Sequence, residues 1–406
     1  MVLFILPISL ILINCIFILI IFYNFYWKRR NLPDGPIPLP IIGNALEISN
    51  ADRRYKCFAD WAKKYGPVYT IWIGEQPLVI VTDYELIKSA FIRDGDTYVD
   101  RDFLIKHFTL FFGSVDGIIR TNGEQWRQMR KFFYKAMRDY GIDKDTVEKQ
   151  VLDAIFRVID KIKNEKEMGK LEHSIDREVD LMTGSIINQI MLGFSFYGER
   201  FKEFSGLKQL LDIQQVYFIN QNSQEKLQNE LDKVMEEKRG LAEETGEEFD
   251  GKFCQSDRTK LSYTNAVVNE TQRLSNLLPL NLTRVANKDV KIGGHSLKAG
   301  TVVIPQISTV LFDERIFPDP EKFIPERFLD ENGQFKKIEE NIPFGVGKRS
   351  CVGEALARME LFLFTANFFY KFHVYPPNPL NPPKYEKRQT FAVKLPEYNC
   401  SVELRN

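Results

Sequence analysis

The residue whose surroundings point most directly to chemistry is Cys351. It stands in the run Phe-Gly-Val-Gly-Lys-Arg-Ser-Cys-Val-Gly of residues 344–353, directly before a segment rich in good helix formers. A cysteine at the start of a helix meets free backbone N–H groups and the positive end of the helix dipole, which stabilise a thiolate. Lys348 and Arg349 add positive charge nearby. The three glycines of the run let the backbone approach a flat ligand closely, so the segment predicts a thiolate that can bind a metal ion.

The competing interpretation of Cys351 is an inert buried thiol, which is the commoner fate of a lone cysteine. The glycine spacing and the basic neighbours argue against it. A thiolate bound to haem iron pushes electron density onto the metal and favours cleavage of an O–O bond. The local sequence therefore favours a cysteine-ligated haem.

The same run resembles the haem-binding loop of the cytochrome P450 family, Phe-x-x-Gly-x-Arg-x-Cys-x-Gly. Its defining positions are filled here by Phe344, Gly347, Arg349, Cys351 and Gly353. The resemblance implies haem b as the cofactor, Cys351 as the proximal iron ligand and Arg349 facing a haem propionate. It is closest in character to the microsomal members of the family.

A second signature combines residues far apart in the chain. Glu270 and Arg273 have the i,i+3 spacing that puts two side chains on one helix face, and Arg327 lies in a Pro-Glu-Arg-Phe run. By itself such a pair is usually a surface salt bridge of little worth. Together these residues resemble the Glu-x-x-Arg and Pro-Glu-Arg-Phe set of the family, which implies a buried structural triad near the cysteine loop.

A third signature is the start of a helix near residue 121. Thr121 and Glu124 have capping-box spacing, and Trp126 and Arg130 then lie one turn apart on the same helix face. The pattern resembles the Trp-x-x-x-Arg helix of the family, which implies that both side chains hydrogen-bond a haem propionate.

Further contacts follow by the same resemblance. Arg101 and Arg284 stand where related microsomal members place additional propionate contacts. The helix that starts near residue 121 also carries four basic residues, Arg127, Lys131, Lys135 and Arg138. They form either a docking face for an acidic electron-donor protein or an ordinary solvated helix face.

The elements that must position these residues are mostly helical. Two β-branched and aromatic runs, 68–73 and 78–81, are separated by Gly-Glu-Gln-Pro and predict a hairpin, and a third strand is expected at 301–304. The acidic stretch 236–250 predicts a solvated loop. The fold is therefore expected to be predominantly α with a small β-sheet and P450-like. Helical periodicity covers residues 124–138, 145–162, 185–193, 223–238, 263–274 and 353–372.

The first 27 residues are almost unbrokenly apolar and are followed by Lys28, Arg29 and Arg30. This length can cross a bilayer as a helix, and the run lacks the basic n-region and cleavage site of a secretory signal peptide, the alternative. The positive cluster predicts a single-pass anchor with the remaining chain on the cytosolic face. The resemblance to microsomal members of the family implies that the membrane is that of the endoplasmic reticulum. A basic and proline-rich hinge is expected at 28–44, and a haem-thiolate domain at 45–406.

The amino-acid composition limits the possible ligands and the compartment of the protein. Lys plus Arg and Asp plus Glu are both 55, and no basic block interleaved with aromatics is visible, so nucleic-acid binding is not expected. The five cysteines are odd in number and scattered, which favours a reducing compartment over a disulfide scaffold or a zinc site.

One part of the family pattern is not found. Family members carry Ala/Gly-Gly-x-Asp/Glu-Thr on a long helix across the distal face of the haem. Residues 206–220 resemble the helix before that region and 224–235 the helix after it, which predicts an internal deletion near 220–223 and leaves no distal catalytic residue to assign. An acid stands beside a threonine in 241–245, but its charged surroundings do not suit a helix that crosses a buried haem.

Two functions follow from these observations. The leading one is a monooxygenase that inserts one atom of O2 into a lipophilic small molecule with electrons from a membrane flavoprotein reductase. The alternative is a catalytically impaired or inactive truncated haem-binding membrane protein. Phe- and Leu-rich segments at 103–112, 277–282 and 390–393 correspond to pocket-lining regions of the family, although ordinary core packing predicts the same residues.

Overall fold

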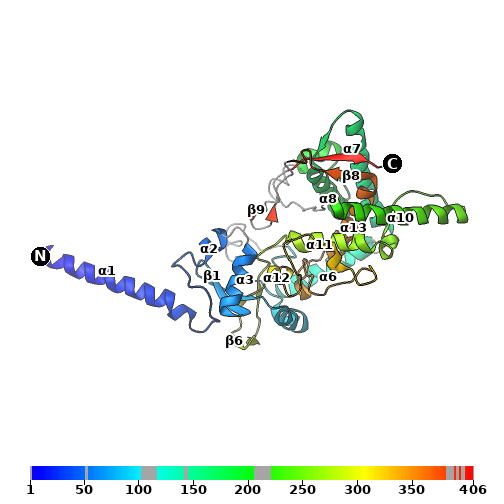
Figure 1. Ribbon diagram of the computed structural model, residues 1–406. Helices are drawn as coiled ribbons and strands as arrows, with labels where there is room; N and C mark the ends of the chain where they lie inside the picture. Colours follow the sequence, from blue (N-terminus) through cyan, green and yellow to red (C-terminus); the bar gives the residue numbers. More distant parts are fainter. Residues whose placement is uncertain are drawn as a thin grey trace. The chain divides into compact units, whose positions relative to one another are not determined.

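The computed structural model divides into two compact units, which are described separately. It describes residues 2–50, 54–101, 117–140, 145–204, 221–380, 388–389, 393–394 and 398–405 (Figure 1). Unit 1 consists of Met1–Met129, Leu278–Val310 and Gly345–Ser350. Unit 2 consists of Arg130–Leu277, Leu311–Phe344 and Cys351–Asn406.

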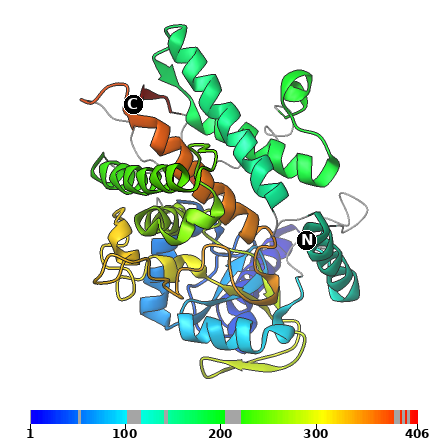
Figure 2. The ribbon, with the colours of Figure 1, turned by 90° about the vertical axis from the view of Figure 1, so that its right-hand side faces the viewer.

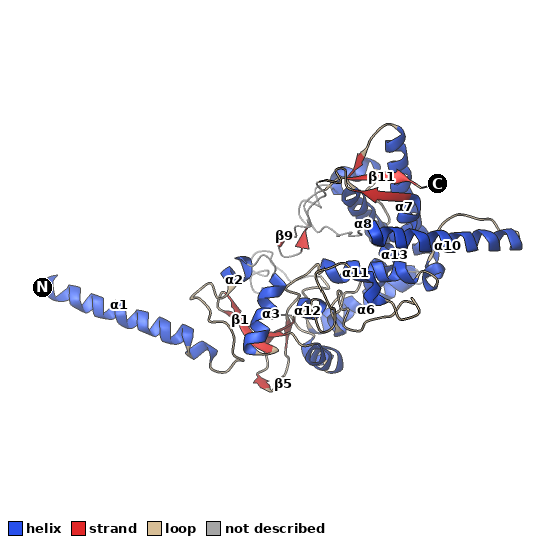
Figure 3. Cartoon of the chain, viewed as in Figure 1, coloured by secondary structure: helices blue, strands red, loops and turns tan. Residues whose placement is uncertain are grey.

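Unit 1 is built around a four-stranded sheet with the order β1-β2-β7-β4. Figure 3 colours the strands red and labels β1. The predicted hairpin is confirmed, since β1 (Val68–Ile73) and β2 (Gln76–Val81) pair in antiparallel register. The strand expected at 301–304 is also present, as β7 (Val302–Pro305), which runs parallel to β2 and antiparallel to β4 (Arg284–Val285). Alternate residues of β1, β2 and β7 pack into one apolar cluster beside helix α3 (Arg54–Tyr65).

Shorter elements complete unit 1. They are α1 (Val2–Phe25), η1 (Trp27–Arg29), α2 (Ala45–Asn50), α4 (Tyr84–Ile87), η2 (Lys88–Arg93), η3 (Gly95–Tyr98), β5 (Val290–Ile292) and β6 (His295–Leu297). Helix α12 (Ile307–Leu311) follows β7. Within the residues whose side chains are described, no helix is both long enough and apolar enough to cross a membrane, and in α1 these residues start at Asn14.

The basic and proline-rich segment 28–44 is hydrogen-bonded to strand β1. The Asn44 side chain accepts from the Trp72 N–H at 2.9 Å and donates to the carbonyl of Ile37 at 3.2 Å. Gly35 passes so close to the strand that an added Cβ would lie 1.9 Å from the Thr70 carbonyl oxygen. The segment therefore needs glycine at this crossing, and it is held along the strand.

Unit 2 is predominantly helical, and α13 (Glu354–Lys371) contacts α7 (Asp145–Glu167), α10 (Gln221–Thr245) and α11 (Ser262–Ser275). Figure 2 shows α13 in orange passing among these helices. Helix α6 (Gly123–Tyr140) continues from unit 1 into unit 2. Unit 2 also contains α8 (Ile175–Leu192), η4 (Gly198–Arg200), η5 (Gln255–Thr259), η6 (Pro325–Phe328) and the sheet β3-β11-β8 (Glu172–His173, Cys400–Leu404, Phe372–Tyr375), with the short pair β9 (Arg388–Gln389) and β10 (Val393–Lys394).

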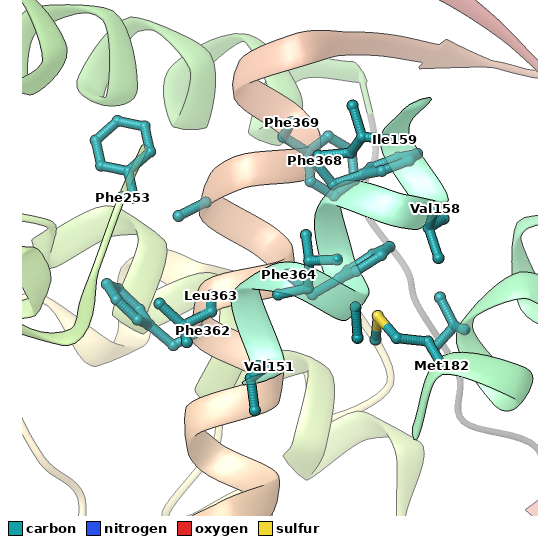
Figure 4. Packing of buried hydrophobic residues seen from close by; sticks show 14 of the residues in the cluster. Val151, Val158, Ile159, Met182, Phe253, Phe362, Leu363, Phe364, Phe368 and Phe369 are labelled. Carbon is teal, nitrogen blue, oxygen red and sulfur yellow. The ribbon is translucent and has the colours of Figure 1, made fainter. Parts of the chain in front are cut away.

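The core of unit 2 gathers on α13. Phe364 and Phe368 stack with ring centroids 4.9 Å apart, and Val158, Ile159 and Met182 come from α7 and α8 to pack around them (Figure 4). Apolar residues on most faces make α13 a buried helix, which gives the residues that precede it a rigid support.

One sequence prediction about secondary structure is wrong. The acidic stretch 236–250 was expected to form a solvated loop, but residues up to Thr245 continue helix α10. The stretch has Glu, Lys, Arg, Ala and Leu at most positions, and these are strong helix formers that need no buried face to stay helical next to an existing helix.

Candidate functional site

The cysteine loop contributes residues to both units. Gly347–Arg349 form a 3-10 turn, η7, in unit 1, and Phe344, Cys351 and Gly353 belong to unit 2. Within unit 2 the Cys351 N–H donates to the Phe344 carbonyl at 3.0 Å, and Gly353 is the N-cap of α13. Cys351 therefore stands two residues before Gly353, the N-cap of α13, as the sequence pattern indicates.

Glycine is required at 347 for two reasons. Its φ is +69°, and an added Cβ would lie 1.8 Å from the Phe91 carbonyl oxygen. By contrast, Cβ atoms added at Gly345 or Gly353 would meet no atom within 4 Å. The backbone is thus packed against the protein at Gly347 and faces open space at the other two glycines, which leaves room for a flat ligand there.

The thiol of Cys351 is in an exposed residue, whereas Cys400 is buried. Partial burial of the thiol group raises the pKa of Cys351, the Gly353 N–H lowers it, Glu354 raises it and Arg130 lowers it. Burial raises the pKa of Cys400 to about 12, so that cysteine favours the neutral thiol. Because metal binding displaces the thiol proton, Cys351 can still become a thiolate ligand.

The expected electrostatic help from Lys348 and Arg349 is not what the structure shows. Lys348 pairs with the carboxylate of Asp96, and its side chain is half exposed. Arg349 is buried and donates to the carbonyls of Val99, Ile118 and Thr121. The positive charges adjacent in sequence to Cys351 are thus directed into unit 1, because a short turn sends successive side chains in different directions.

Unit 1 brings three predicted arginines together. Arg101, Arg284 and Arg349 are 8%, 3% and 6% exposed. The Thr283 carbonyl accepts from both Arg101 at 2.9 Å and Arg284 at 3.2 Å, and Arg284 also donates to the carbonyl of Arg349 at 3.4 Å. We call this set the unit 1 arginine cluster. Three buried guanidinium groups in one region suit the binding of carboxylates.

Trp126 belongs to the same region. Its side chain is buried, and the guanidinium carbon of Arg349 lies 4.0 Å from its ring centroid. The capping box predicted at the start of this helix is wrong, because helix α6 begins at Gly123 and the Thr121 hydroxyl donates to the Gly117 carbonyl at 3.0 Å. The Asn122 side chain instead accepts from the Arg101 N–H, which ties the helix start to the cluster.

Arg130 lies one turn after Trp126 and belongs to unit 2. Its guanidinium donates to the Tyr134 hydroxyl at 2.8 Å, and it lies close enough to Cys351 to lower the pKa of that thiol. The four basic residues considered as a docking face, Arg127, Lys131, Lys135 and Arg138, are all exposed. Exposed Phe132 stands among them, 72% accessible.

The structure places Glu270, Arg273 and Arg327 together in unit 2. Both Glu270 oxygens accept from Arg273, at 2.7 and 2.9 Å, and one also accepts from Arg327 at 3.2 Å. Glu270 and Arg273 are fully buried, and the Arg327 side chain is 8% exposed. Arg273 further donates to the carbonyls of Leu311 and Lys322. This triad links α11, η6 and the segment between α12 and η6.

Sequence reasoning missed two residues that support this region. Glu230 on α10 accepts from the N–H groups of Tyr263 and Thr264 at 2.7 and 2.8 Å, so it caps the start of α11 from another helix. Arg358 on α13 contacts both Phe344 and residues of α11. The i,i+4 spacing of Glu354 and Arg358 was visible in the sequence, whereas the contacts of Arg358 with other elements depend on the fold.

The segments expected to line a substrate pocket are only partly described. Residues 103–112 and 390–392 lie outside the described residues. Residues 278–282 belong to unit 1, where Asn281 donates to the Pro305 carbonyl at 2.8 Å and the Pro279 carbonyl accepts from Ser308 at 2.6 Å. These bonds hold the segment to the end of β7.

The residues around the predicted deletion are described only on one side. Residues 206–220 lie outside the described residues, while 221–223 and 224–235 form the start of α10. The acidic and threonine-containing segment 241–245 is the exposed end of α10, where the Thr245 hydroxyl donates to the Leu241 carbonyl. It does not cross an apolar region, in agreement with its rejection as a distal helix.

Comparisons with known proteins identify the class. The sequence model of cytochrome P450 matches residues 33–219 and 217–403 of this chain. The chain is 29% identical to "Cytochrome P450 2H2" of Gallus gallus over 467 residues, which cover 91% of this chain and 93% of that protein. It is also 29% identical to "Cytochrome P450 2C21" of Canis lupus familiaris over 465 residues, which cover 90% of this chain and 94% of that protein.

The chain belongs to the cytochrome P450 family of haem monooxygenases. Members of the family bind haem b through a cysteine thiolate, and haem b is therefore the cofactor. The residues present fit such a group, since they offer a thiol beside open space at Gly353 and, in unit 1, a cluster of buried guanidinium groups with an aromatic ring.

Proposed function

We propose that this chain is a haem-thiolate monooxygenase in which Cys351 binds the iron and a lipophilic small molecule is the substrate. The observation that carries the proposal is the loop of residues 344–353, in which Phe344, Gly347, Arg349, Cys351 and Gly353 fill the family pattern directly before a helix start, and in which Cys351 is an exposed residue. Cys400 is a poor alternative ligand, because it is buried and its thiol donates to the His173 carbonyl at 3.5 Å.

The chain's own residues would hold the haem at its iron and at its propionates. Cys351 would supply the thiolate, with the Gly353 N–H stabilising its negative charge. Arg101, Arg284 and Arg349 would bind the propionates in unit 1, beside Trp126, and Arg130 would add a further contact. When bound, the haem supplies the activation of O2 and the transfer of one oxygen atom to the substrate.

Membrane attachment is the second part of the proposal. Residues 1–27 would anchor the chain in the endoplasmic reticulum membrane, with Lys28, Arg29 and Arg30 on the cytosolic side. A membrane flavoprotein reductase would supply electrons at the exposed basic face of α6. A lipophilic substrate would enter from the same membrane.

An internal deletion near residues 220–223 is the third part. Two separate matches to the family meet at residues 217–219, and the aligned span of 467 positions exceeds the 406 residues of the chain. Because 91% of the chain is about 370 residues, about 100 positions of the relative have no counterpart here. If the distal helix is missing, the chain lacks the residues that would normally deliver protons at the haem iron.

Such a deletion would also be compatible with a second candidate function, a haem-binding membrane protein that lacks oxygenase activity. Both candidates require Cys351 to bind haem iron, so they share the first test and differ in the second.

The first test is the spectrum of the reduced, carbon monoxide-treated full-length protein. A red-shifted Soret band typical of a thiolate ligand is expected, and the Cys351→Ala variant should lose it. Cys400→Ala is the matched control and should keep the band. Loss of the band in Cys400→Ala with retention in Cys351→Ala would contradict the assignment of the ligand.

The second test separates the two candidates. The protein is reconstituted in vesicles with a flavoprotein reductase, and consumption of reduced nicotinamide cofactor is compared with product formed from a set of lipophilic compounds. Coupled product formation supports the monooxygenase. Consumption of electrons that yields no oxygenated product from any compound, in a protein with a normal thiolate band, supports the haem-binding candidate.

A further inference from the structure

Arg358 lies on the first turns of α13, seven residues after Cys351, and contacts three different elements of unit 2. Its side chain is 22% exposed. On its own helix, Nε donates to Oε1 of Glu354 at 2.9 Å. A partly exposed i,i+4 pair of this kind contributes little by itself, so the role of Arg358 depends on what the rest of its guanidinium contacts.

The second set of contacts crosses to α11. Arg358 Nη1 donates to Oε1 of Gln272 at 3.1 Å and to Oδ1 of Asn269 at 3.4 Å. Asn269 and Gln272 flank the triad residue Glu270, and Oδ1 of Asn269 also accepts from Asn341 at 3.2 Å. Asn341 stands three residues before Phe344, so this network reaches the start of the cysteine loop.

The third contact is with Phe344 itself. The guanidinium carbon of Arg358 lies 5.0 Å from the centroid of the Phe344 ring. The carbonyl of the same phenylalanine accepts the N–H of Cys351 at 3.0 Å. Arg358 therefore contacts the side chain of the residue whose main chain fixes the cysteine backbone, and a cation over an aromatic face is attractive by about 0.5–2 kcal/mol.

We propose that Arg358 is a positioning residue, which holds Phe344 between α13 and α11 and thereby fixes the backbone of Cys351. The inference rests on the proposed function in one respect, since it takes Cys351 to be the iron ligand. Lysine cannot replace this arginine fully, because an ammonium group lacks the planar fork that donates to Glu354, Asn269 and Gln272 at the same time.

The first experiment does not need haem. Hydrogen–deuterium exchange of the peptide covering residues 345–356 is compared in the full-length wild type, Arg358→Ala and Glu354→Ala. Arg358→Ala is expected to speed exchange at the Cys351 amide about threefold or more, because the Phe344 acceptor loosens. Glu354→Ala removes only the pair within the helix and should leave that exchange rate unchanged. Equal rates in wild type and Arg358→Ala would overturn the proposal.

The second experiment follows the haem spectrum at equal folded fraction, determined by far-UV circular dichroism. Arg358→Ala should lower the thiolate-type fraction of the reduced, carbon monoxide-bound spectrum by about half or more, while total bound haem falls less. Phe344→Leu should have a similar effect, and the double variant should be no worse than either single variant. Additive losses would show that Arg358 does not act through Phe344.

The variants also cover the case in which Arg358→Ala does not fold. Arg358→Lys keeps the charge and is expected to retain the fold with an intermediate exchange rate and an intermediate thiolate fraction. If Arg358→Lys equals wild type in both measurements, only the positive charge at this position matters, and the proposal is overturned. A wild type that lacks the thiolate band would contradict the proposed function, while the exchange experiment would still decide the role of Arg358.

Discussion

Buried arginines are used in two different ways in the two units. In the triad of unit 2, Arg273 and Arg327 both donate to one carboxylate, Glu270, so each guanidinium group has a carboxylate partner within the protein. In the arginine cluster of unit 1, Arg101, Arg284 and Arg349 donate to main-chain carbonyls, among them those of Thr283 and Thr121. The first arrangement suits a structural support, and the second suits a site for a carboxylate ligand.

The largest expected effect tests the structural half of this comparison. Glu270→Ala leaves two buried guanidinium groups without their carboxylate and is expected to lower the free energy of unfolding by about 3–5 kcal/mol. Urea unfolding followed by circular dichroism measures it. Lys322→Ala, which removes an exposed pair with Asp319, is the control and should leave the urea midpoint unchanged. A change under about 1 kcal/mol in Glu270→Ala would contradict a structural role of the triad.

A second prediction tests the ligand-binding half. Arg284→Leu leaves carbonyl acceptors unsatisfied, and we expect a loss of about 1–3 kcal/mol in the free energy of unfolding. Its effect on haem retention should be greater, since the proposed propionate partner is removed. Haem transfer to excess apomyoglobin should be clearly faster than in wild type. If haem transfer is unchanged while stability falls, the cluster is structural and the contrast with the triad disappears.

A third prediction concerns a buried carboxyl that lacks an arginine. Glu360 on α13 is buried, its Oε1 has no hydrogen-bond partner in the described part of the chain, and burial raises its pKa from 4.5 to about 8, while a hydrogen bond from Thr183 lowers it. Below pH 4.5 both folded and unfolded chains are protonated there. As pH rises to about 8, only the unfolded chain releases the proton, so stability falls by up to about 1.4 kcal/mol per pH unit.

Glu360→Gln is the direct test of that pH dependence. The amide cannot ionise, so the variant should be more stable than wild type at pH 8 and similar to it at pH 5. Urea unfolding at both pH values gives the comparison. A wild type and variant with the same pH profile would show that Glu360 does not titrate in this window.

The smallest effect is expected at Lys348. Its pair with Asp96 is on the surface, in contrast to the buried hydrogen bonds of its neighbour Arg349. Lys348→Ala should leave both the urea midpoint and the bound haem unchanged. A clear loss of haem in this variant would show that the exposed charge, and not the buried cluster, governs binding in unit 1.

Much of the site could be predicted from the sequence because its signals are local. The spacing of Gly347, Cys351 and Gly353 requires only a turn and a following helix. The hairpin of β1 and β2 follows from alternation and a short connection. The pairing of Glu270 with Arg273 follows from helical spacing, although the addition of Arg327 depended on resemblance to a family.

The failures share a physical cause. Thr121 had the spacing of a cap, but its hydroxyl bonds the Gly117 carbonyl, while Asn122 is used by Arg101. Residues 236–245 had the composition of a loop, yet an existing helix extended through them at little cost. In each case several local states have similar free energies, and contacts or neighbours elsewhere select one.

The sequence by itself therefore determined the turn and helix start of residues 344–353, the family and the haem cofactor, because those rest on residue identity at fixed spacing. Only the tertiary structure decided where the charges beside Cys351 point, since Lys348 and Arg349 are adjacent in the chain but bond to different elements of unit 1. It also decided that Arg358 connects α13, α11 and Phe344. The direction of a side chain and the partners it meets depend on how distant segments pack, which residue spacing does not encode.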